Sequence, residues 1–549
     1  MSATTSPPAG APINKGETGQ TGWSDPWLWA LLGLGLGLRL LDIDEPLIDQ
    51  QAWRQTDTAA LARNYYQEGY TLLYPRVDWR GQTPGFVETN FPFFPFMVAC
   101  LYGVFGGANE WLGRLLAAVF NVAAGGLLYA LARRFYIEPW SARLSVLFYL
   151  IFPLNLFFGR AFMPEAAMLF FSIAALLTLD RWFESGTRLD GLWAIASAAL
   201  CFLIKIPTLY MGFPLVALAW GRWGWGFLRR PALWAYLILS LLPAFIWYEH
   251  AYGLFQQTGL TFGIFQTSGY DKWNHVLLLQ PDFYWNLIKR FGHSIFTPLG
   301  LLLVLWGLGR GIRAAFRDKE RVLYIWFAAL ILYVLLVPEG NRKLHYYQLP
   351  FVPVAALFAA KALNGIWYGM RVSLSARMTT GLVVCALVGC GAYSAWAVQD
   401  YRRPGNGLYA YYKMCLAVGR TIDAKLPQDA LLVVGDWDEN AGADNRTQSP
   451  SLLYYSARKG WHITPDEFSA STLDSLAGLG ANYFLAFGGL AVENKVFWAH
   501  LLERGVSMPS VYPRVWHDTG VLKSAVIDYP EEQRQFMLVH LRPLEQITQ

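Results

Sequence analysis

Charged residues are scarce in this chain: Asp, Glu, Lys and Arg make up only 15% of its 549 residues, while hydrophobic residues make up 54%. This composition excludes both an ordinary soluble enzyme and a disordered chain. The five cysteines have neither the spacing of a disulfide framework nor that of a metal site. The net charge of +5 is too small to indicate nucleic-acid binding, and no internal repeat indicates a solenoid. The class that remains is a membrane protein.

Several apolar runs approach the roughly 20 residues that a helix needs to cross a bilayer. They predict a polytopic α-helical membrane protein with about eleven transmembrane helices, at residues 26–42, 112–132, 142–159, 164–180, 191–204, 207–221, 231–248, 294–309, 322–338, 345–363 and 378–398.

The apolar run 91–107 is ambiguous, because it either spans the membrane or lies along it. If it spans, Arg133 and Arg134 lie outside; if it lies along the membrane, this pair and most other loop arginines lie in the cytoplasm. The positive-inside rule favours the second arrangement. We therefore expect a cytoplasmic N-terminus and two membrane-parallel helices, 51–68 and 91–106, in the first outer loop.

Composition divides the chain into three parts. Residues 1–24 are predicted to form a flexible cytoplasmic tail, because residues 1–22 lack the apolar core of a signal peptide. Residues 25–400 form the membrane domain, which includes a long outer loop at about 249–292. Residues 401–549 alternate strand-like runs (LLVVGDW, NYFLAF, FMLVHL) with helical stretches near 450–459, 470–479 and 492–504. This pattern predicts a small α/β domain on the outer side.

The polar segment 49–97, between two hydrophobic stretches, contains the first candidate site residue, Asp57. Asp57 lies on the more apolar face of an amphipathic helix, whereas Gln55, Ala62 and Arg63 point elsewhere. A carboxylate on such a face costs free energy unless it has a partner. Asp57 either caps a first turn or pairs with Arg54, or it faces a reaction chamber as a catalytic acid or base.

Further charged residues are predicted to meet at the same outer surface. Each has an ordinary interpretation: a loop acid, a helix N-terminal acid, a snorkelling lysine, or charges near a span end. Arg342 and Lys343, two cations predicted outside the membrane, nevertheless oppose the positive-inside trend, and a phosphate is their natural partner. The candidates are Glu88, Arg160, Glu165, Lys205, Arg342, Lys343, His345, Tyr346 and Tyr347.

Acids beside cations, under a hydrophobic bundle, suit a substrate with an anionic phosphate and a long apolar tail. The acids would activate an incoming hydroxyl as general base, and the cations would stabilise the departing phosphate. This chemistry is glycosyl transfer from a polyprenyl-phosphate sugar.

The motifs resemble those of GT-C glycosyltransferases of the protein O-mannosyltransferase type, which include the bacterial aminoarabinose transferase acting on lipid A. The resemblance covers about residues 26–365. TAALARNYYQEGYTLLYPRVD is similar to the family's first membrane-parallel helix and the segment after it, and FVETNFPFFPF to its acid-x-x-Pro-Pro segment. GRAFMPEAAMLF resembles its arginine/acid turn, CFLIKIPTLYMGFP its Lys-Gly turn, and RKLHYYQLPFVP its Arg/Lys–Tyr–Tyr–Leu–Pro segment.

The resemblance implies roles for residues. It implies Glu88 as a catalytic or substrate-binding acid and places Glu165 at the acid of the arginine/acid turn. Ile206 stands where the family has glycine. The family's acid pair before the first surface helix is missing, because Arg54 and Gln55 occupy those places, and the next acid is Asp57.

We therefore expect Asp57 and Glu88 to be catalytic, in a single displacement that inverts the sugar's anomeric carbon. Substrate-binding residues are expected to be Arg54, Arg160, Glu165, Lys205, Arg342, Lys343, His345, Tyr346 and Tyr347. No cofactor is required by the spacing, although Asp57 and Glu88 are the candidate ligands if a divalent cation, Mg²⁺ or Mn²⁺, takes part.

The expected partners are a polyprenyl-phosphate sugar donor, a lipid, glycan or protein acceptor and membrane lipids, with no nucleic acid. The expected location is the bacterial cytoplasmic membrane, with the C-terminal domain extracytoplasmic. Two alternatives stay open. A lipid-linked oligosaccharide polymerase or ligase would carry more arginine in the large outer loop, and a transporter or flippase for a lipid-linked sugar would carry more charge at mid-membrane depth.

Overall fold

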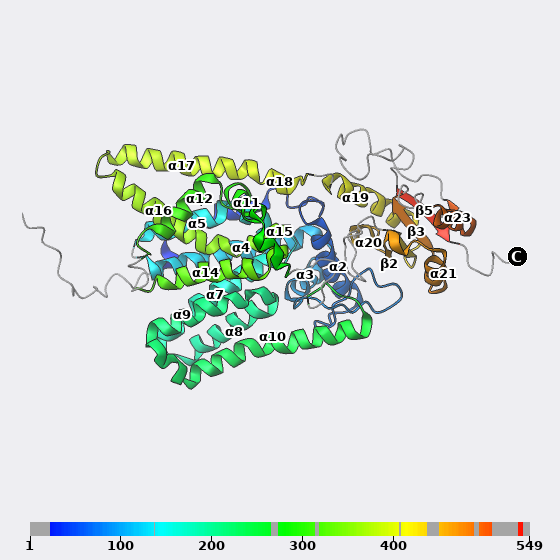
Figure 1. The fold of residues 1–549 in the computed structure, drawn as a ribbon, viewed down its shortest axis with the longest axis horizontal. Coiled ribbons are helices and arrows are strands. Elements are labelled where there is room, and N and C mark those ends of the chain that lie inside the picture. The colour runs from blue at the N-terminus through cyan, green and yellow to red at the C-terminus, as the bar shows by residue number, and fades with distance from the viewer. Residues whose placement is uncertain are drawn as a thin grey trace, which may run out of the picture.

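The computed structural model describes residues 22–136, 138–264, 273–312, 318–405, 408–435, 450–487, 494–507 and 536–541. Most of the N-terminal tail lies outside these ranges. A helical bundle fills one end of the molecule and a small α/β domain the other (Figure 1). The bundle helices are α1 (Pro26–Leu40), α4 (Glu110–Phe135), α5 (Pro139–Ile151), α6 (Pro153–Phe158), α7 (Glu165–Ser185), α8 (Arg188–Ile204), α9 (Gly212–Trp223), α10 (Pro231–Thr258), α12 (Pro298–Gly309), α14 (Arg321–Leu336), α16 (Phe351–Met370) and α17 (Ala376–Ala397).

Within the described residues, five helices are long and apolar enough to cross a membrane, and a sixth results if the bent pair Pro281–Ile295 and Pro298–Gly309 is one span. Three shorter apolar helices, α1, α14 and α3 (Phe93–Phe105), do not meet this length. The helical membrane fold is thus confirmed, while the number of eleven spans stays a prediction. Residues 249–292 do not form one continuous loop: α10 continues to Thr258, and α11 (Pro281–Arg290) occupies part of the rest.

The two helices predicted in the first outer loop are present as α2 (Ala52–Glu68) and α3. They pack against each other at the end of the bundle that faces the α/β domain (Figure 1). Helix α3 has 13 residues and is therefore about 20 Å long, too short to cross a hydrocarbon core of roughly 30 Å. The ambiguous apolar run 91–107 thus forms a short helix that packs beside α2.

The prediction that α2 has one buried face is wrong. Gln55, Ala62 and Arg63, expected to point away from the buried face, are 0%, 0% and 9% exposed. The α/β domain packs on that side, because helix α20 (Pro450–Tyr455) contacts α2 directly. A helix between two partners buries residues around most of its circumference, so its sequence shows little amphipathic pattern.

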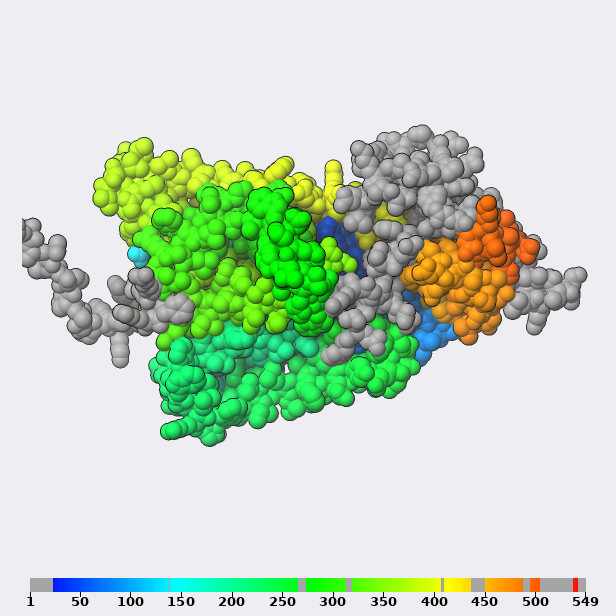
Figure 2. All heavy atoms as spheres, viewed as in Figure 1, coloured from blue at the N-terminus to red at the C-terminus, as the bar shows by residue number. Residues whose placement is uncertain are grey.

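The described part of the C-terminal domain contains a five-stranded mixed sheet of order β2-β1-β3-β5-β4, in which β2, β1 and β3 are parallel. Strands β1 (Leu431–Gly435), β3 (Tyr483–Phe487) and β5 (Phe536–Leu541) match the three strand-like runs, whereas β2 (Lys459–Ile463) and β4 (Gly505–Ser507) were not predicted. Helices α19 (Leu408–Lys425), α20, α21 (Ala470–Gly478) and α23 (Lys495–Arg504) complete it. The space-filling view shows the C-terminal domain in contact with the outer loop (Figure 2).

A buried arginine supports the break between α5 and α6. Pro153 has no N–H, so the carbonyl of Tyr149 loses its helical donor and accepts from Asn155 Nδ2 at 2.6 Å instead. Arg39, which is fully buried, donates to the carbonyls of Leu150 at 3.2 Å and Asn155 at 3.1 Å. The guanidinium thus supplies a donor to the Leu150 carbonyl at the break and a second donor to the Asn155 carbonyl, which also accepts from Gly159 N–H.

Arg39→Met should lower the unfolding temperature of the protein in detergent, because it removes the guanidinium donor of the Leu150 carbonyl, whereas the Asn155 carbonyl keeps the N–H of Gly159. Each buried group without a hydrogen bond costs about 1–3 kcal/mol. Differential scanning fluorimetry measures the effect, with Arg133→Met, at an exposed position, as the control. Equal unfolding temperatures for the two variants would show that Arg39 does not support the break.

Candidate functional site

A cavity of about 500 Å³ opens between the bundle and the segment that contains α2 and α3. Its polar part includes Arg54, Asn90 and Lys205, and its other walls are apolar and aromatic. The lining residues are Trp53, Arg54, Asn90, Lys205, Ile206, Pro207, Leu209, Tyr210, Phe213, Phe262, Gly263, Ile264, Trp273, Ala329, Leu332, Tyr333, Leu336, Val337, Leu344, Tyr346 and Tyr347.

The apolar wall of the cavity continues onto the surface of the bundle. Leu209 and Phe213, from the start of α9 and the turn before it, are about half exposed. Leu332 and Leu336 of α14 line the same cavity and are also exposed. Exposed apolar side chains on a membrane helix face lipid. The cavity therefore joins a polar end to a wall that continues toward the hydrocarbon.

Lys205 lies at the polar end of the cavity, directly after the last residue of α8. Its Nζ donates to Glu165 Oε1 at 2.6 Å, and both side chains are buried. The ammonium also lies over the rings of Tyr346, at 4.6 Å from the centroid, and Tyr347, at 5.3 Å. An opposite charge and two aromatic faces stabilise a cation that burial alone would destabilise.

Arg54 reaches the same cavity from α2. Its guanidinium lies 4.8 Å from the centroid of the Phe262 ring, and Phe262 also lines the cavity. The structure thus brings together five of the predicted residues: Arg54, Glu165, Lys205, Tyr346 and Tyr347.

Asp57 lies one turn after Arg54 on α2 and is 3% exposed. Its Oδ1 accepts a hydrogen bond from Trp79 Nε1 at 3.1 Å. Helix α2 has no acid in its first turn, so Asp57 is not a first-turn cap. The cavity lining includes Trp53 and Arg54 from α2 but not Asp57, so its carboxylate lies behind the wall in this structure.

Glu88 holds one wall of the cavity from behind. Its carboxylate accepts hydrogen bonds from the Thr261 hydroxyl and from the Ile264 N–H, the latter at 3.2 Å. Its own N–H donates to Leu260 O at 3.0 Å, and Phe262 N–H donates to Glu88 O at 2.9 Å. Glu88 therefore fixes the segment 260–264, which supplies three of the lining residues.

Arg160 belongs to a different buried cluster. It donates to the carbonyls of Leu41 and Asp42, both at 2.8 Å, and its Nη2 lies 3.8 Å from Asp49 Oδ2. Burial and the neighbouring Arg114 lower the pKa of Arg160 to about 10. Asp49 also accepts from Gln55 Nε2 at 2.5 Å. This cluster anchors the start of α2 to the bundle, and Arg160 does not line the cavity.

Arg342 and Lys343 lie on the short helix α15 (Pro338–Lys343) and pair with Glu339, one turn earlier in the chain. Arg342 Nε donates to Glu339 at 2.7 Å, and Lys343 Nζ lies 3.4 Å from the same carboxylate. Neither residue is among those that line the cavity. Their role in phosphate binding stays a prediction.

His345 is half-buried beside the ring of Tyr401, with 5.7 Å between the ring centroids, and does not line the cavity. Burial, together with the positive charge of Arg290, lowers the pKa of His345 to about 3. The imidazole is therefore neutral at neutral pH and supplies no positive charge for a phosphate.

Several residues of the site were not identified from the sequence. Asn90 is two residues after Glu88, and Trp53 directly precedes Arg54. This proximity in the sequence is the feature that could have indicated them as cavity residues. Phe262 carries no local motif, because its role comes from contacts with distant segments. Within the described residues, no three His, Cys, Asp or Glu side chains gather as a metal site. The cation suggested for Asp57 and Glu88 stays a prediction.

Comparisons with known proteins find similarity in the fold. The family model described as dolichyl-phosphate-mannose-protein mannosyltransferase matches residues 88–248. No curated protein matches the chain significantly by sequence. ArnT from Cupriavidus metallidurans bound to undecaprenyl phosphate is similar in structure, with a TM-score of 0.59 at 14% identity, over 94% of this chain and 98% of that one.

The apo form of that ArnT gives a TM-score of 0.58 at 14% identity, over 85% of this chain and 94% of that one. The oligosaccharyltransferase of Archaeoglobus fulgidus gives 0.52 at 13% identity, over 87% of this chain and 71% of that one. These similarities confirm the expected resemblance: the chain has the fold of the GT-C glycosyltransferases.

His345 should make the protein less stable in mild acid. Its folded pKa of about 3 lies below the ordinary value of 6.5, so below pH 6.5 the unfolded chain binds a proton that the folded chain does not. The stabilisation is complete above pH 6.5 and is lost as the pH falls toward 3, at up to about 1.4 kcal/mol per pH unit.

The unfolding temperature measured between pH 7 and 4 tests this. His345→Gln should flatten the acid side of the profile, whereas His275→Gln, at an exposed position, should not. An unchanged slope in His345→Gln would show that folding does not lower the pKa of this ring.

Proposed function

We propose that this protein is a glycosyltransferase that moves a monosaccharide from a polyprenyl-phosphate carrier to an acceptor hydroxyl or phosphate on the outer face of a bacterial cytoplasmic membrane. The observation that supports it most is the cavity itself. Its polar end contains Lys205 and Arg54, and its apolar wall continues to exposed side chains of α9 and α14. A phosphate at the cations would leave its prenyl chain along the apolar wall. The structure of ArnT with undecaprenyl phosphate has the same fold.

In the proposed reaction, Lys205 and Arg54 bind the carrier phosphate. Glu165 and the two tyrosine rings hold the ammonium of Lys205 in place. Charge-assisted hydrogen bonds of this kind are about twice as strong as neutral ones. As the sugar–oxygen bond breaks, the negative charge on the departing phosphate grows, and the same cations stabilise it more strongly than they stabilise the bound donor.

Asp57 is the proposed general base. It lies three residues after Arg54 on α2 and therefore on the same side of the helix. Its carboxylate takes the proton of the acceptor hydroxyl while that oxygen attacks the anomeric carbon, and the phosphate leaves from the opposite face. The base reaches the acceptor only when Trp53 or the 260–264 segment moves aside, and Glu88 controls that segment through Thr261 and Ile264.

Lys205→Met should weaken binding of undecaprenyl phosphate by about tenfold to hundredfold, the effect of losing a hydrogen bond to a charged group. Binding is measured by thermal stabilisation in detergent, with undecaprenol as the ligand that lacks phosphate. The double variant Lys205→Met/Glu165→Gln avoids an unpaired buried carboxylate and should show the same loss while folding normally. Lys289→Met, at an exposed position, is the control. Wild-type affinity in the double variant would place the phosphate elsewhere.

Asp57→Asn should reduce turnover by about 10²- to 10⁴-fold, the usual contribution of a general base, without changing affinity for undecaprenyl phosphate. Transfer from a radiolabelled polyprenyl-phosphate sugar to a membrane extract measures turnover. Glu88→Gln tests the second predicted catalytic acid in the same assay. Asp282→Asn and Glu249→Gln, both at exposed positions, are the matched controls. Unchanged turnover in Asp57→Asn would remove it from the reaction.

A further inference from the structure

Helix α2 connects the cavity to the C-terminal domain. On one side Trp53 and Arg54 line the cavity. On the other side Thr56 Oγ1 lies 3.0 Å from Ser451 Oγ, and Arg63 Nη1 donates to Tyr454 O at 2.7 Å. The proposed reaction does not require any residue after 400. These contacts nevertheless connect the C-terminal domain to the helix that carries Arg54 and Asp57.

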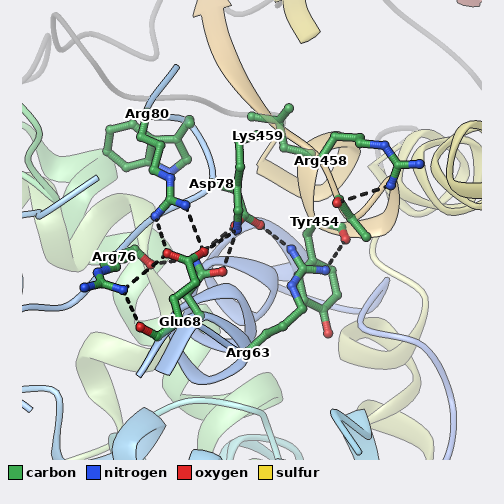
Figure 3. A network of polar contacts seen from close by, with 12 residues as sticks. Arg63, Glu68, Arg76, Asp78, Arg80, Tyr454, Arg458 and Lys459 are labelled. Atoms are coloured by element: carbon green, nitrogen blue, oxygen red, sulfur yellow. Dashed lines mark hydrogen bonds and ion pairs between the residues drawn. The ribbon is translucent and has the colours of Figure 1, made fainter. Parts of the chain in front are cut away.

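A buried ion cluster strengthens this contact (Figure 3). Asp78, in the loop after α2, is 2% exposed and pairs with Arg63 Nη2 at 2.5 Å and with Lys459 Nζ of β2. Asn64 Nδ2 donates to the same carboxylate at 3.0 Å. Burial raises the pKa of Asp78, but Arg63 and Lys459 outweigh burial and hold that pKa well below its usual value. Lys459 is thus one of two cations that keep Asp78 charged.

Backbone hydrogen bonds fix the same loop to β2. Gly460 N–H donates to Asp78 O at 3.1 Å, and Gly81 N–H donates to Gly460 O at 2.6 Å. Gly81 has φ +57, and a Cβ there would lie 2.3 Å from the ring of Trp461. A larger residue at 81 would be strained at this φ and would have to displace the ring of Trp461. The outer loop and the C-terminal domain are therefore in close backbone contact.

The loop carries this contact to the cavity. Trp79 follows Asp78 directly, and its Nε1 donates to Asp57 at 3.1 Å. Its ring lies edge-on to Phe262, with 5.9 Å between the centroids, and Phe262 supports Arg54 in the cavity wall. A shift of Asp78 would therefore move the proposed base and one phosphate-binding residue.

We propose that Lys459 is a positioning residue for the transfer reaction: the C-terminal domain supplies the cation that holds Asp78, and through Trp79 it sets the position of Asp57. The inference rests on the proposed function and goes beyond it, because it makes the C-terminal domain part of the active-site support. Misplacement of a catalytic group by about 1 Å costs up to roughly a hundredfold in rate.

Lys459→Met tests the proposal. Asp78 keeps its pair with Arg63 in this variant, so the protein is expected to fold. We expect kcat to fall by roughly tenfold to hundredfold, with a much smaller loss of affinity for undecaprenyl phosphate, because Arg54 shifts with the cavity wall while Lys205 stays paired with Glu165 on the bundle. Lys459→Arg should restore most of the rate, and Lys425→Met, at an exposed position of the same domain, should leave it unchanged. Wild-type kcat in Lys459→Met, or equal losses of kcat and lipid affinity, would overturn the proposal.

A second readout does not depend on activity. Hydrogen exchange of residues 75–88 should be faster in Lys459→Met than in the wild type, whereas exchange in α16 should be unchanged. Trp79→Phe, which removes the hydrogen bond to Asp57 and leaves the ion cluster in place, should lower kcat with no change in exchange at Asp78. If the wild type transfers no sugar, the proposed function fails, while the exchange result still decides whether Lys459 holds the loop. Unchanged exchange in Lys459→Met would overturn the inference by itself.

Discussion

The ion pair between Glu165 and Lys205 is the interaction on which the rest of the site depends. Both side chains are buried at the boundary between an apolar bundle and the outer loop. Removing one partner of such a pair costs about 3–5 kcal/mol, because the other charge is left without compensation. The folded protein therefore keeps both partners together, and the pair fixes the ammonium of Lys205 at the end of an apolar cavity. Tyr346 and Tyr347 restrict its direction further. Arg54 is the second cation that lines the cavity. Two cations at one end of a cavity suit a single anionic group, such as a phosphate.

The second constraint is the burial of α2 on both sides. A helix that carries cavity residues on one side and contacts a separate domain on the other cannot move without disturbing both. This explains why an outer loop with so many polar residues is ordered at the end of a hydrophobic bundle: Asp49, Asp78 and Glu88 each hold one part of it. The carboxylates of the loop thus divide between support of the wall and, for Asp57, the proposed chemistry.

The sequence predicted what depends on local pattern. Apolar length located the bundle helices, and turn residues with helical spacing located α2 and α3 to within two residues. It also predicted that Lys205, Glu165, Tyr346 and Tyr347 lie near one another, because polar residues at span ends are conspicuous in an apolar chain. It did not predict contacts between distant segments: Glu88 meets Thr261, and Lys459 meets Asp78. For the same reason α2 was expected to have one buried face, and strand β2, whose burial does not alternate, was missed. Arg160, Arg342 and His345 were grouped with the site from topology and from short motifs, which place residues near a surface but do not show which side chains line a cavity.

The central claim is that the carrier phosphate binds at Lys205 and Arg54. An electron cryomicroscopy map of the protein in nanodiscs with undecaprenyl phosphate tests it most directly. The account predicts phosphate density within hydrogen-bond distance of Lys205 Nζ, with the prenyl chain leaving past Leu209 and Leu336. Phosphate density at Arg342 and Lys343, with the cavity occupied by other lipid or empty, would contradict it.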